Sequence, residues 1–159
     1  MNLSVYVDCN HPESPKPEAF ETWVATALSG NHSRWCPSEV AEVSIQVVDS
    51  EAMTRFNHQY RGKDADTNVL SFPIDPELQK QTGLLGDLII CSDVVQREAN
   101  EQSKTPEHHW AHMTIHGTLH LLGYDHITDA DADIMEAIEI SRLAQLSIPN
   151  PYTQTENFT

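Results

Sequence analysis

Four stretches of the chain have the apolar pattern of β-strands, either alternating with polar residues or running on as an apolar segment, which predicts four strands. The expected strands cover residues 2–8, 40–48, 67–72 and 84–91, and the last is apolar enough to be central in a sheet. Between and after them, apolar residues recur every three or four positions, the spacing of one helix face. Because strands and helices interleave, we expect a single α/β domain with a mixed sheet of about four strands.

Capping residues set the expected limits of the helices. Helices are expected from Pro17 to Gly30, from Asp49 or Ser50 to Gly62, after Ser92, from Thr105 through the histidine-rich stretch, and from Thr128 to Leu146. Residues 75–83 are polar and are expected to form a mobile loop. The domain is expected to span residues 1–146, with a flexible tail at 147–159 that holds two prolines and few apolar side chains.

Composition narrows the class of protein. The 159 residues suffice for one full core, and 39% hydrophobic and 21% charged residues are ordinary for a soluble protein. The N-terminus enters an expected strand directly, and no apolar run approaches the ~18 residues of a membrane span, so we expect neither a signal peptide nor a membrane segment. Three cysteines without metal-type spacing favour a reducing, cytoplasmic setting.

Three histidines fall close together at the end of the long helix expected after Thr105. His116 and His120 are four residues apart and can point two imidazoles at one spot. Gly123 can adopt a positive φ and end the helix, so the chain can turn and bring His126 to the same spot. Three neutral imidazoles form a ligand set for a divalent metal, zinc by preference, with a fourth position left open.

The spacing of these histidines matches the zinc signature of metzincin proteases, His-Glu-x-x-His-x-x-Gly-x-x-His, with one departure. Gly117 stands where those proteases have their general base. A glycine within a helix costs about 1 kcal/mol relative to alanine. Either a need for space beside the metal or a close contact between the helix and a strand would explain a glycine at position 117.

His112 is expected to be a non-ligand, either behind the site or facing solvent, and His108 and His109 are expected to be exposed.

Three stretches together resemble the YbeY family of bacterial endoribonucleases. They are residues 116–126, HGTLHLLGYDH; residues 60–73, with YRGKD and TNVLSFP; and residues 84–88, LLGDL. The resemblance implies a metal-dependent endoribonuclease for single-stranded RNA, with roles in maturing the 3′ end of 16S ribosomal RNA and in ribosome quality control. It also implies zinc bound by His116, His120 and His126, and a functional arginine at Arg61.

The residue chemistry is compatible with cleavage of a phosphodiester. A bound metal lowers the pKa of water and polarises a phosphoryl oxygen, and a planar guanidinium such as that of Arg61 can bind two phosphate oxygens. Lys63 and Arg55 are weaker candidates for contact with the RNA. Asp125 or Asp87 could orient a ligand histidine through its second ring nitrogen, or could simply cap a turn or a strand end.

The formal net charge of −15 argues against a broad basic surface for nucleic acid. We therefore expect a small positive groove near Arg55, Arg61, Lys63 and the metal, and a protein partner in the ribosome or among ribosomal proteins.

Two alternatives to this function stay open. One is another metal hydrolase, acting on an ester or a peptide with a different carboxylate as base. The other is a non-catalytic ribosome-assembly factor with a structural metal.

Overall fold

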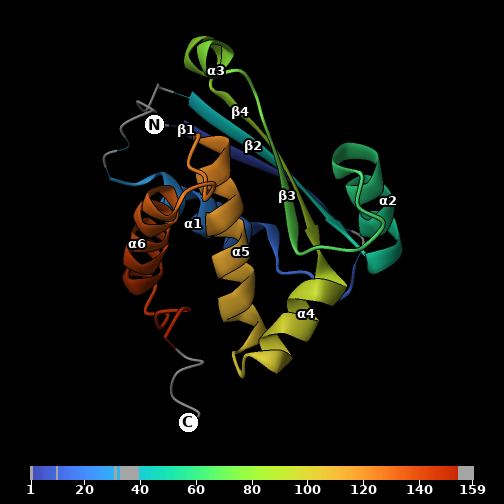
Figure 1. Ribbon diagram of the computed structural model, residues 1–159. Coiled ribbons are helices and arrows are strands. Elements are labelled where there is room, and N and C mark those ends of the chain that lie inside the picture. The colour runs from blue at the N-terminus through green and yellow to red at the C-terminus, as the bar shows by residue number, and fades with distance from the viewer. Residues whose placement is uncertain (1, 10, 31, 33–39, 154–159) are drawn as a thin grey trace.

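A four-stranded sheet with helices packed on it forms the expected α/β domain (Figure 1). The computed structural model describes residues 2–9, 11–30, 32 and 40–153. Its strands are β1 (Asn2–Cys9), β2 (Val40–Val48), β3 (Val69–Pro73) and β4 (Leu84–Cys91). Its helices are α1 (Pro17–Leu28), α2 (Ser50–Arg61), α3 (Pro76–Thr82), α4 (Ser92–Glu101), α5 (Pro106–Leu121) and α6 (Asp129–Gln145).

The strands lie in the order β1-β2-β4-β3, so β2 and β4 form the centre of the sheet. The pairs β1–β2 and β2–β4 are parallel, whereas the edge strand β3 runs antiparallel to β4. The prediction of a mixed sheet with β4 at its centre is therefore confirmed. Ser71 pairs with Leu88 and Phe72 with Asp87, so successive β3 side chains point to opposite faces of the sheet.

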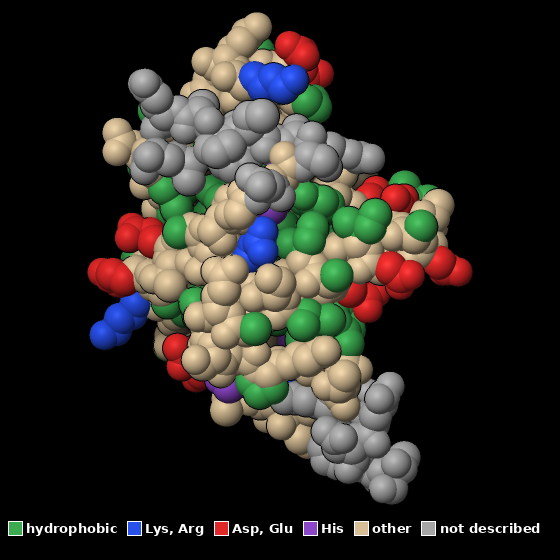
Figure 2. All heavy atoms as spheres, turned by 90° about the vertical axis from the view of Figure 1, so that its left-hand side faces the viewer, with side chains coloured by type: hydrophobic (Ala, Val, Ile, Leu, Met, Phe, Trp, Pro, Cys, Tyr) green, Lys and Arg blue, Asp and Glu red, His purple; other side chains and the backbone are tan. Residues whose placement is uncertain are grey.

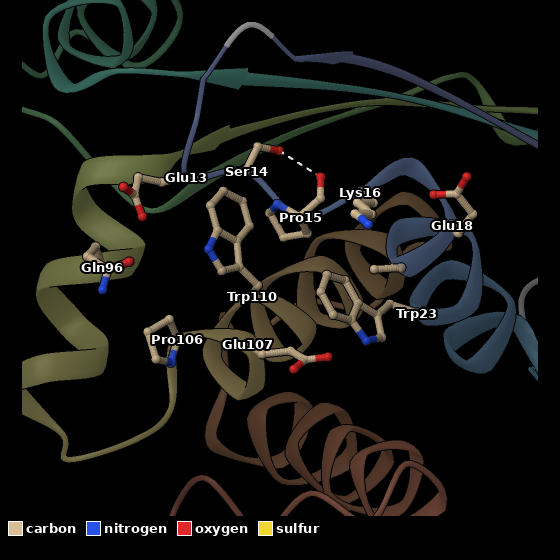
Figure 3. A pocket seen from close by; sticks show the side chains of 11 residues that line it. Glu13, Ser14, Pro15, Lys16, Glu18, Trp23, Gln96, Pro106, Glu107 and Trp110 are labelled. Carbon is tan, nitrogen blue, oxygen red and sulfur yellow. Dashed lines mark hydrogen bonds between the residues drawn. The ribbon is translucent and has the colours of Figure 1, made fainter.

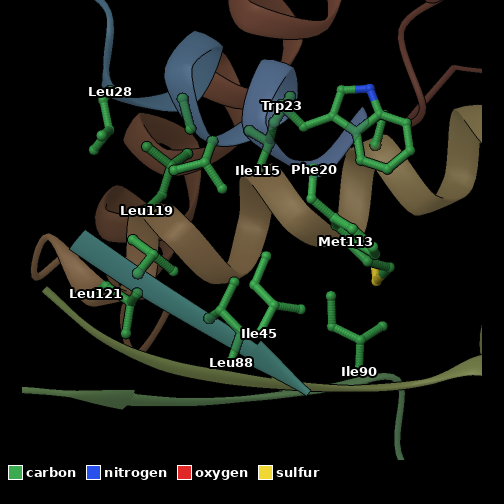
Figure 4. Packing of buried hydrophobic residues seen from close by; sticks show 14 of the residues in the cluster. Phe20, Trp23, Leu28, Ile45, Leu88, Ile90, Met113, Ile115, Leu119 and Leu121 are labelled. Carbon is green, nitrogen blue, oxygen red and sulfur yellow. The ribbon is translucent and has the colours of Figure 1, made fainter. Parts of the chain in front are cut away.

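The main hydrophobic core lies between one face of the sheet and the helices α1 and α5. Figure 4 shows Ile45 of β2 and Leu88 and Ile90 of β4 directed toward these helices, in a cluster that also contains Phe20 and Leu119. A smaller cluster around Met53 joins α2 to the ends of β2 and β4 on the other face. This cluster covers only part of the second sheet face.

Helix α5 carries the predicted histidines and packs against α1, α4, α6, β3 and β4. Gly117 faces the sheet, where a Cβ atom would lie 2.9 Å from Leu88 Cδ2 and 3.2 Å from Val69 Cγ2. The Ser71 hydroxyl donates to the Gly117 carbonyl at 3.2 Å. Close contact between helix and sheet therefore explains this glycine, which decides between the two reasons that the sequence left open.

The helix starts follow the predicted caps, with one exception. Asp49, Thr105 and Thr128 each accept a backbone N–H in the first turn of the helix they precede. Ser92, expected as a cap, is instead the first residue of α4, and its hydroxyl lies 3.2 Å from His11 Nδ1. Local side-chain chemistry thus fixes most helix starts in this chain.

The expectation of a mobile loop at residues 75–83 is wrong, because this segment forms helix α3. Asp75 accepts the N–H of Glu77 and caps the helix. The buried Gln79 donates to the carbonyls of Leu85 at 2.9 Å and Leu121 at 2.8 Å. These long-range bonds to β4 and α5 hold a polar sequence in place, and the polar pattern alone did not reveal them.

The chain beyond α6 returns to the body of the molecule. Within the stretch predicted as a flexible tail, Pro151 is buried and Tyr152 contacts Glu139. The domain limit at residue 146 stays a prediction, and residues 154–159 lie outside the described residues.

No helix in the described ranges is long and apolar enough to cross a membrane. On the face seen in Figure 2, acidic side chains occur at several places, whereas the basic side chains lie separately and form no patch.

Candidate metal centre

The three predicted ligand histidines meet at the end of α5. The rings of His116 and His120, one turn apart, have centroids 4.6 Å apart. The helix then ends in a Schellman motif, in which the N–H of Gly123 donates to the His120 carbonyl at 3.0 Å. Gly123 has the expected positive φ, 101°. The turn brings the His126 ring to 5.2 Å from that of His120 and 5.7 Å from that of His116.

Hydrogen bonds fix which ring nitrogen of His116 and of His120 faces the position where the three imidazoles converge. His116 Nδ1 donates to the Glu139 carboxylate at 3.0 Å, and His120 Nδ1 donates to the Tyr124 carbonyl at 2.9 Å. Because a carboxylate and a carbonyl only accept, each Nδ1 carries the proton and each Nε2 a lone pair. The two Nε2 atoms lie 3.2 Å apart, and ligand atoms of all three histidines, His126 included, lie within 4.8 Å of one another.

This arrangement fits a metal ion. Two lone pairs that face each other at 3.2 Å repel unless a positive charge lies between them. A proton is disfavoured there, because burial and the neighbouring His116 and His126 lower the pKa of His120 to about 4. A divalent metal meets the need, since it binds neutral imidazole through the unprotonated nitrogen.

Glu139 of α6 supports the histidines from behind. Its side chain is 1% exposed and accepts from His112 Nε2 and the Tyr152 hydroxyl, both at 2.5 Å, as well as from His116. Burial alone would raise the pKa of Glu139, but the hydrogen bonds from His112 and His116 outweigh burial and keep the pKa below its ordinary value. Glu139 is thus an ionised carboxylate that orients His116, as carboxylates behind metal-binding histidines do.

Sequence reasoning missed Glu139, although its position carried a signal. Glu139 lies four residues after Met135 and four before Leu143, and all three are buried on one face of α6. A carboxylate in such a row needs hydrogen-bond donors, because an unpaired buried charge is costly. The histidines of α5 are the donors that the fold provides.

Two further histidines of α5 are buried. His112, left between two roles by the sequence, bonds to Glu139. His112, His116 and Glu139 also lie close enough to hold a metal, but hydrogen bonds among them already join the facing atoms. His109 was expected to be exposed, and this is wrong: it is 2% exposed and bonds to Glu98 at 2.9 Å. The packing of α4 and α6 on α5 buries both.

The histidines open into a cleft of about 670 Å³ between the end of α2, strand β3 and the turn after α5. Arg61, the last residue of α2, lines this cleft and is exposed. Among the described residues, the arginines that form ion pairs with carboxylates are Arg55 and Arg97, so the guanidinium of Arg61 is available for an anion. His126 is exposed at the mouth of the cleft, which leaves the metal position accessible to a ligand.

The other predicted cations do not line this cleft. Arg55 forms an exposed ion pair with Glu51 at 3.3 Å, one helix turn away. Lys63 is exposed beyond the end of α2. Among the described residues that line the cleft, Arg61 alone brings a permanent positive charge. The groove expected from Arg55, Arg61 and Lys63 is therefore reduced to one arginine beside the candidate metal position.

The two predicted carboxylates do not orient a histidine ring. Asp125 lines the cleft, but its carboxylate accepts the backbone N–H of His126 at 2.8 Å and so shapes the turn. Asp87 follows Gly86, which faces Leu121, and side chains alternate along a strand. Asp87 therefore lies on the sheet face opposite α5, away from the histidines. Glu139 performs the role that was expected of these residues.

A second cavity, of about 480 Å³, lies between the start of α1, α4 and the start of α5 (Figure 3). Trp23 and Trp110 line it but are only 5% and 2% exposed, and Trp110 packs edge-on against Phe20. None of the described residues that line it is a histidine or a cysteine, so this cavity offers no imidazole or thiolate to a metal.

Known proteins resemble this chain over most of its length. The family model described as "Endoribonuclease YbeY" matches residues 7–147. An Endoribonuclease YbeY from Colwellia psychrerythraea is 46% identical over 152 residues, which cover 96% of this chain and 97% of the relative. The solution structure of TM1509 from Thermotoga maritima has a TM-score of 0.56 at 22% identity, covers 98% of this chain and 92% of its own, and supports the fold alone.

Proposed function

Because this chain belongs to the YbeY family of endoribonucleases, we propose that it is a zinc-dependent enzyme that cuts single-stranded RNA and matures the 3′ end of 16S ribosomal RNA. Membership of the family makes the chain an endoribonuclease, which is a hydrolase. The observation that carries the proposal is the convergence of three imidazoles and the exposed Arg61 on one cleft.

In this proposal the residues of the cleft hold and orient the reacting groups. His116, His120 and His126 would hold the zinc ion through their ring nitrogens. When bound, the ion supplies a water molecule of lowered pKa and polarises a phosphoryl oxygen. Arg61 binds the phosphate with its planar guanidinium and neutralises the charge that develops there. Glu139 keeps His116 in the tautomer that binds metal.

Two observations favour this function over a protease of the metzincin type and over a structural metal site. A protease of the metzincin type needs a carboxylate beside the first histidine, and Gly117 instead packs on Leu88 and Val69. A structural zinc site is closed by four protein ligands, whereas this histidine set opens into a cleft with His126 exposed. Both observations support a catalytic metal that works without the protease base, and Arg61 in the same cleft supports a phosphate as substrate.

The charge distribution supports recognition of RNA at a few phosphates only. With a net charge of −15 and Arg61 as the described basic side chain of the cleft, the affinity for RNA should depend weakly on salt. We therefore propose that the ribosome or a ribosomal protein presents the RNA, that the enzyme acts in the cytoplasm, and that it takes part in ribosome quality control.

Cleavage of a precursor of the 16S rRNA 3′ end by the zinc-loaded protein, with and without ribosomal subunits, tests this function. We expect cleavage of single-stranded RNA and not of the same sequence in a duplex. Arg61→Ala should bind zinc normally but cleave at least about 100-fold more slowly, the usual cost of losing one charge-stabilising donor. Arg97→Ala, which removes an exposed arginine paired with Asp66, is the matched control.

His116→Ala should lose both zinc and activity. Equal cleavage rates of Arg61→Ala and wild type would contradict the role of the arginine. A full zinc content in His116→Ala would contradict the three-histidine site.

A further inference from the structure

The wall of the metal cleft contains a tyrosine, Tyr124, in the turn between His120 and His126. Among the described residues that line the cleft, it is the one with a phenylalanine, tyrosine or tryptophan side chain. Its side chain is partly buried against the main hydrophobic core and also lines the cleft beside the histidines. Tyr124 therefore presents an aromatic surface in the cleft that holds the candidate metal position and Arg61.

The backbone of Tyr124 is fixed by α5. Its N–H donates to the Leu119 carbonyl at 3.1 Å, and its carbonyl accepts from His120 Nδ1 at 2.9 Å. Both bonds belong to the main chain of residue 124, so they do not depend on its side chain. The orientation of His120 therefore leaves the phenol ring of Tyr124 available for another role.

The side chain of Tyr124 is fixed separately, by His32. His32 Nε2 donates to the Ala27 carbonyl at 3.0 Å, so the unprotonated Nδ1 accepts from the Tyr124 hydroxyl at 2.9 Å. Burial and the nearby Arg142 lower the pKa of His32, which keeps its ring neutral. The two rings meet edge-on with centroids 5.6 Å apart. The protein itself thus holds the phenol ring in one orientation.

An aromatic ring held in this way suits a nucleobase. Aromatic side chains bind unpaired bases by stacking, and a ring that is already oriented loses little conformational entropy when a base stacks on it. A base within a duplex must first leave its own stack. Arg61 lines the same cleft and can bind a phosphate of the strand, so a neighbouring base can turn toward Tyr124.

We propose that Tyr124 stacks on one unpaired base beside the cleaved bond, and that His32 holds the ring for this contact. This inference rests on the proposed function and adds a residue through which the cleft selects single strands. Because every base has an aromatic face, the position should accept all four bases. Loss of the stack should lower kcat/KM about tenfold or more, the usual effect of removing one contact between a base and an aromatic ring.

The test removes the base and the ring in turn. Short single-stranded RNAs carry one abasic ribose, scanned along both sides of the cleaved bond, and kcat/KM is measured for each. Wild type should lose about tenfold or more at one position. Tyr124→Leu should lose as much on intact RNA and nothing further when that base is absent, because both changes remove the same contact. Losses that multiply would show that the base and the ring do not meet, and would overturn the inference.

Two variants examine the part of His32. Tyr124→Phe keeps the ring but loses the bond to His32, so its loss of kcat/KM should be smaller than that of Tyr124→Leu, and His32→Leu should match it. A Tyr124→Phe protein as fast as wild type would refute the role of His32. Tyr6→Leu is the matched control and should behave as wild type, because Tyr6 is 57% exposed on β1 and is not among the described residues of the cleft wall.

A second readout separates the stack from cleavage and from metal binding. Cleavage by wild type tests the proposed function, whereas binding of fluorescent RNA to metal-free protein tests the stack alone and should show the same loss at the same abasic position. The abasic scan with wild type also tests the stack if Tyr124→Leu does not fold. Zinc affinity of Tyr124→Leu should equal that of wild type, because the main-chain bond to His120 remains. A loss of zinc affinity equal to the loss of cleavage would show that Tyr124 acts only through His120, and the inference would be wrong.

Discussion

Glu139→Gln removes the negative charge behind His116 and keeps the size of the side chain. Glutamine still accepts through its carbonyl oxygen, but its amide nitrogen faces groups that are themselves donors. The Glu139 carboxylate serves three donors, from His112, His116 and Tyr152, so at least one of them loses its partner. The substitution therefore disturbs both the buried network and the orientation of His116, the proposed metal ligand.

The two effects have different expected sizes. Loss of the partner behind a metal-binding histidine weakens metal affinity about 10–100-fold, which corresponds to about 1.4–2.8 kcal/mol. One unpaired buried donor costs about 1–3 kcal/mol of folding stability. For a chain of this length each kcal/mol lowers Tm by about 2–4 °C. Glu139→Ala should cost more stability than Glu139→Gln, because it leaves all three donors unpaired.

Zinc competition against a chelator measures the first effect, and thermal unfolding of metal-free protein measures the second. Asp133→Asn, an exposed carboxylate of the same helix, is the matched control and should change neither quantity. Tyr152→Phe should give a smaller loss of zinc affinity, because it removes one of the three donors and leaves the bond to His116. A folded Glu139→Gln protein that binds zinc as tightly as wild type would refute the reasoning.

Three further predictions concern the frame around the site. Gly117→Ala should destabilise the protein by about 1–3 kcal/mol in thermal unfolding, because the new methyl group overpacks Leu88; a more stable variant, as helix propensity alone predicts, would contradict this. Gln79→Leu should cost about 1–3 kcal/mol, because the buried carbonyls of Leu85 and Leu121 lose a donor; Gln81→Leu, exposed on the same helix, is its control. Removal of zinc by a chelator should abolish RNA cleavage and leave the circular dichroism spectrum nearly unchanged, because the hydrophobic core rather than the metal holds α5; unfolding on chelation would show a structural metal.

The parts of the site that sequence predicted are those built by local geometry. His116 and His120 share a helix face because a helix repeats every 3.6 residues. Gly123 ends α5 with a positive φ, which glycine adopts without steric cost. Helix caps such as Thr105 form bonds over three residues. Each feature depends on neighbours along the chain, so the spacing of residue types was enough to find it.

The parts that sequence missed depend on contacts between distant residues. Gln79 bonds to a residue of α5, and α3 forms where a mobile loop was expected. Arg55 and Arg61 both belong to α2, yet only Arg61 reaches the cleft. No pattern within one segment reveals such partners, because they depend on which elements the fold places side by side.

Sequence by itself thus determined the class of fold, the convergence of three imidazoles and the absence of a protease base beside them. Tertiary structure alone decided that Glu139 supports His116, that Gly117 serves packing, and that Asp87 faces a separate cavity. The physical reason is the separation along the chain between the residues that interact. A helix face and a turn are set by bonds between close neighbours in the chain, whereas the partner of a buried charge and the face of a strand side chain are set by the packing of the whole domain.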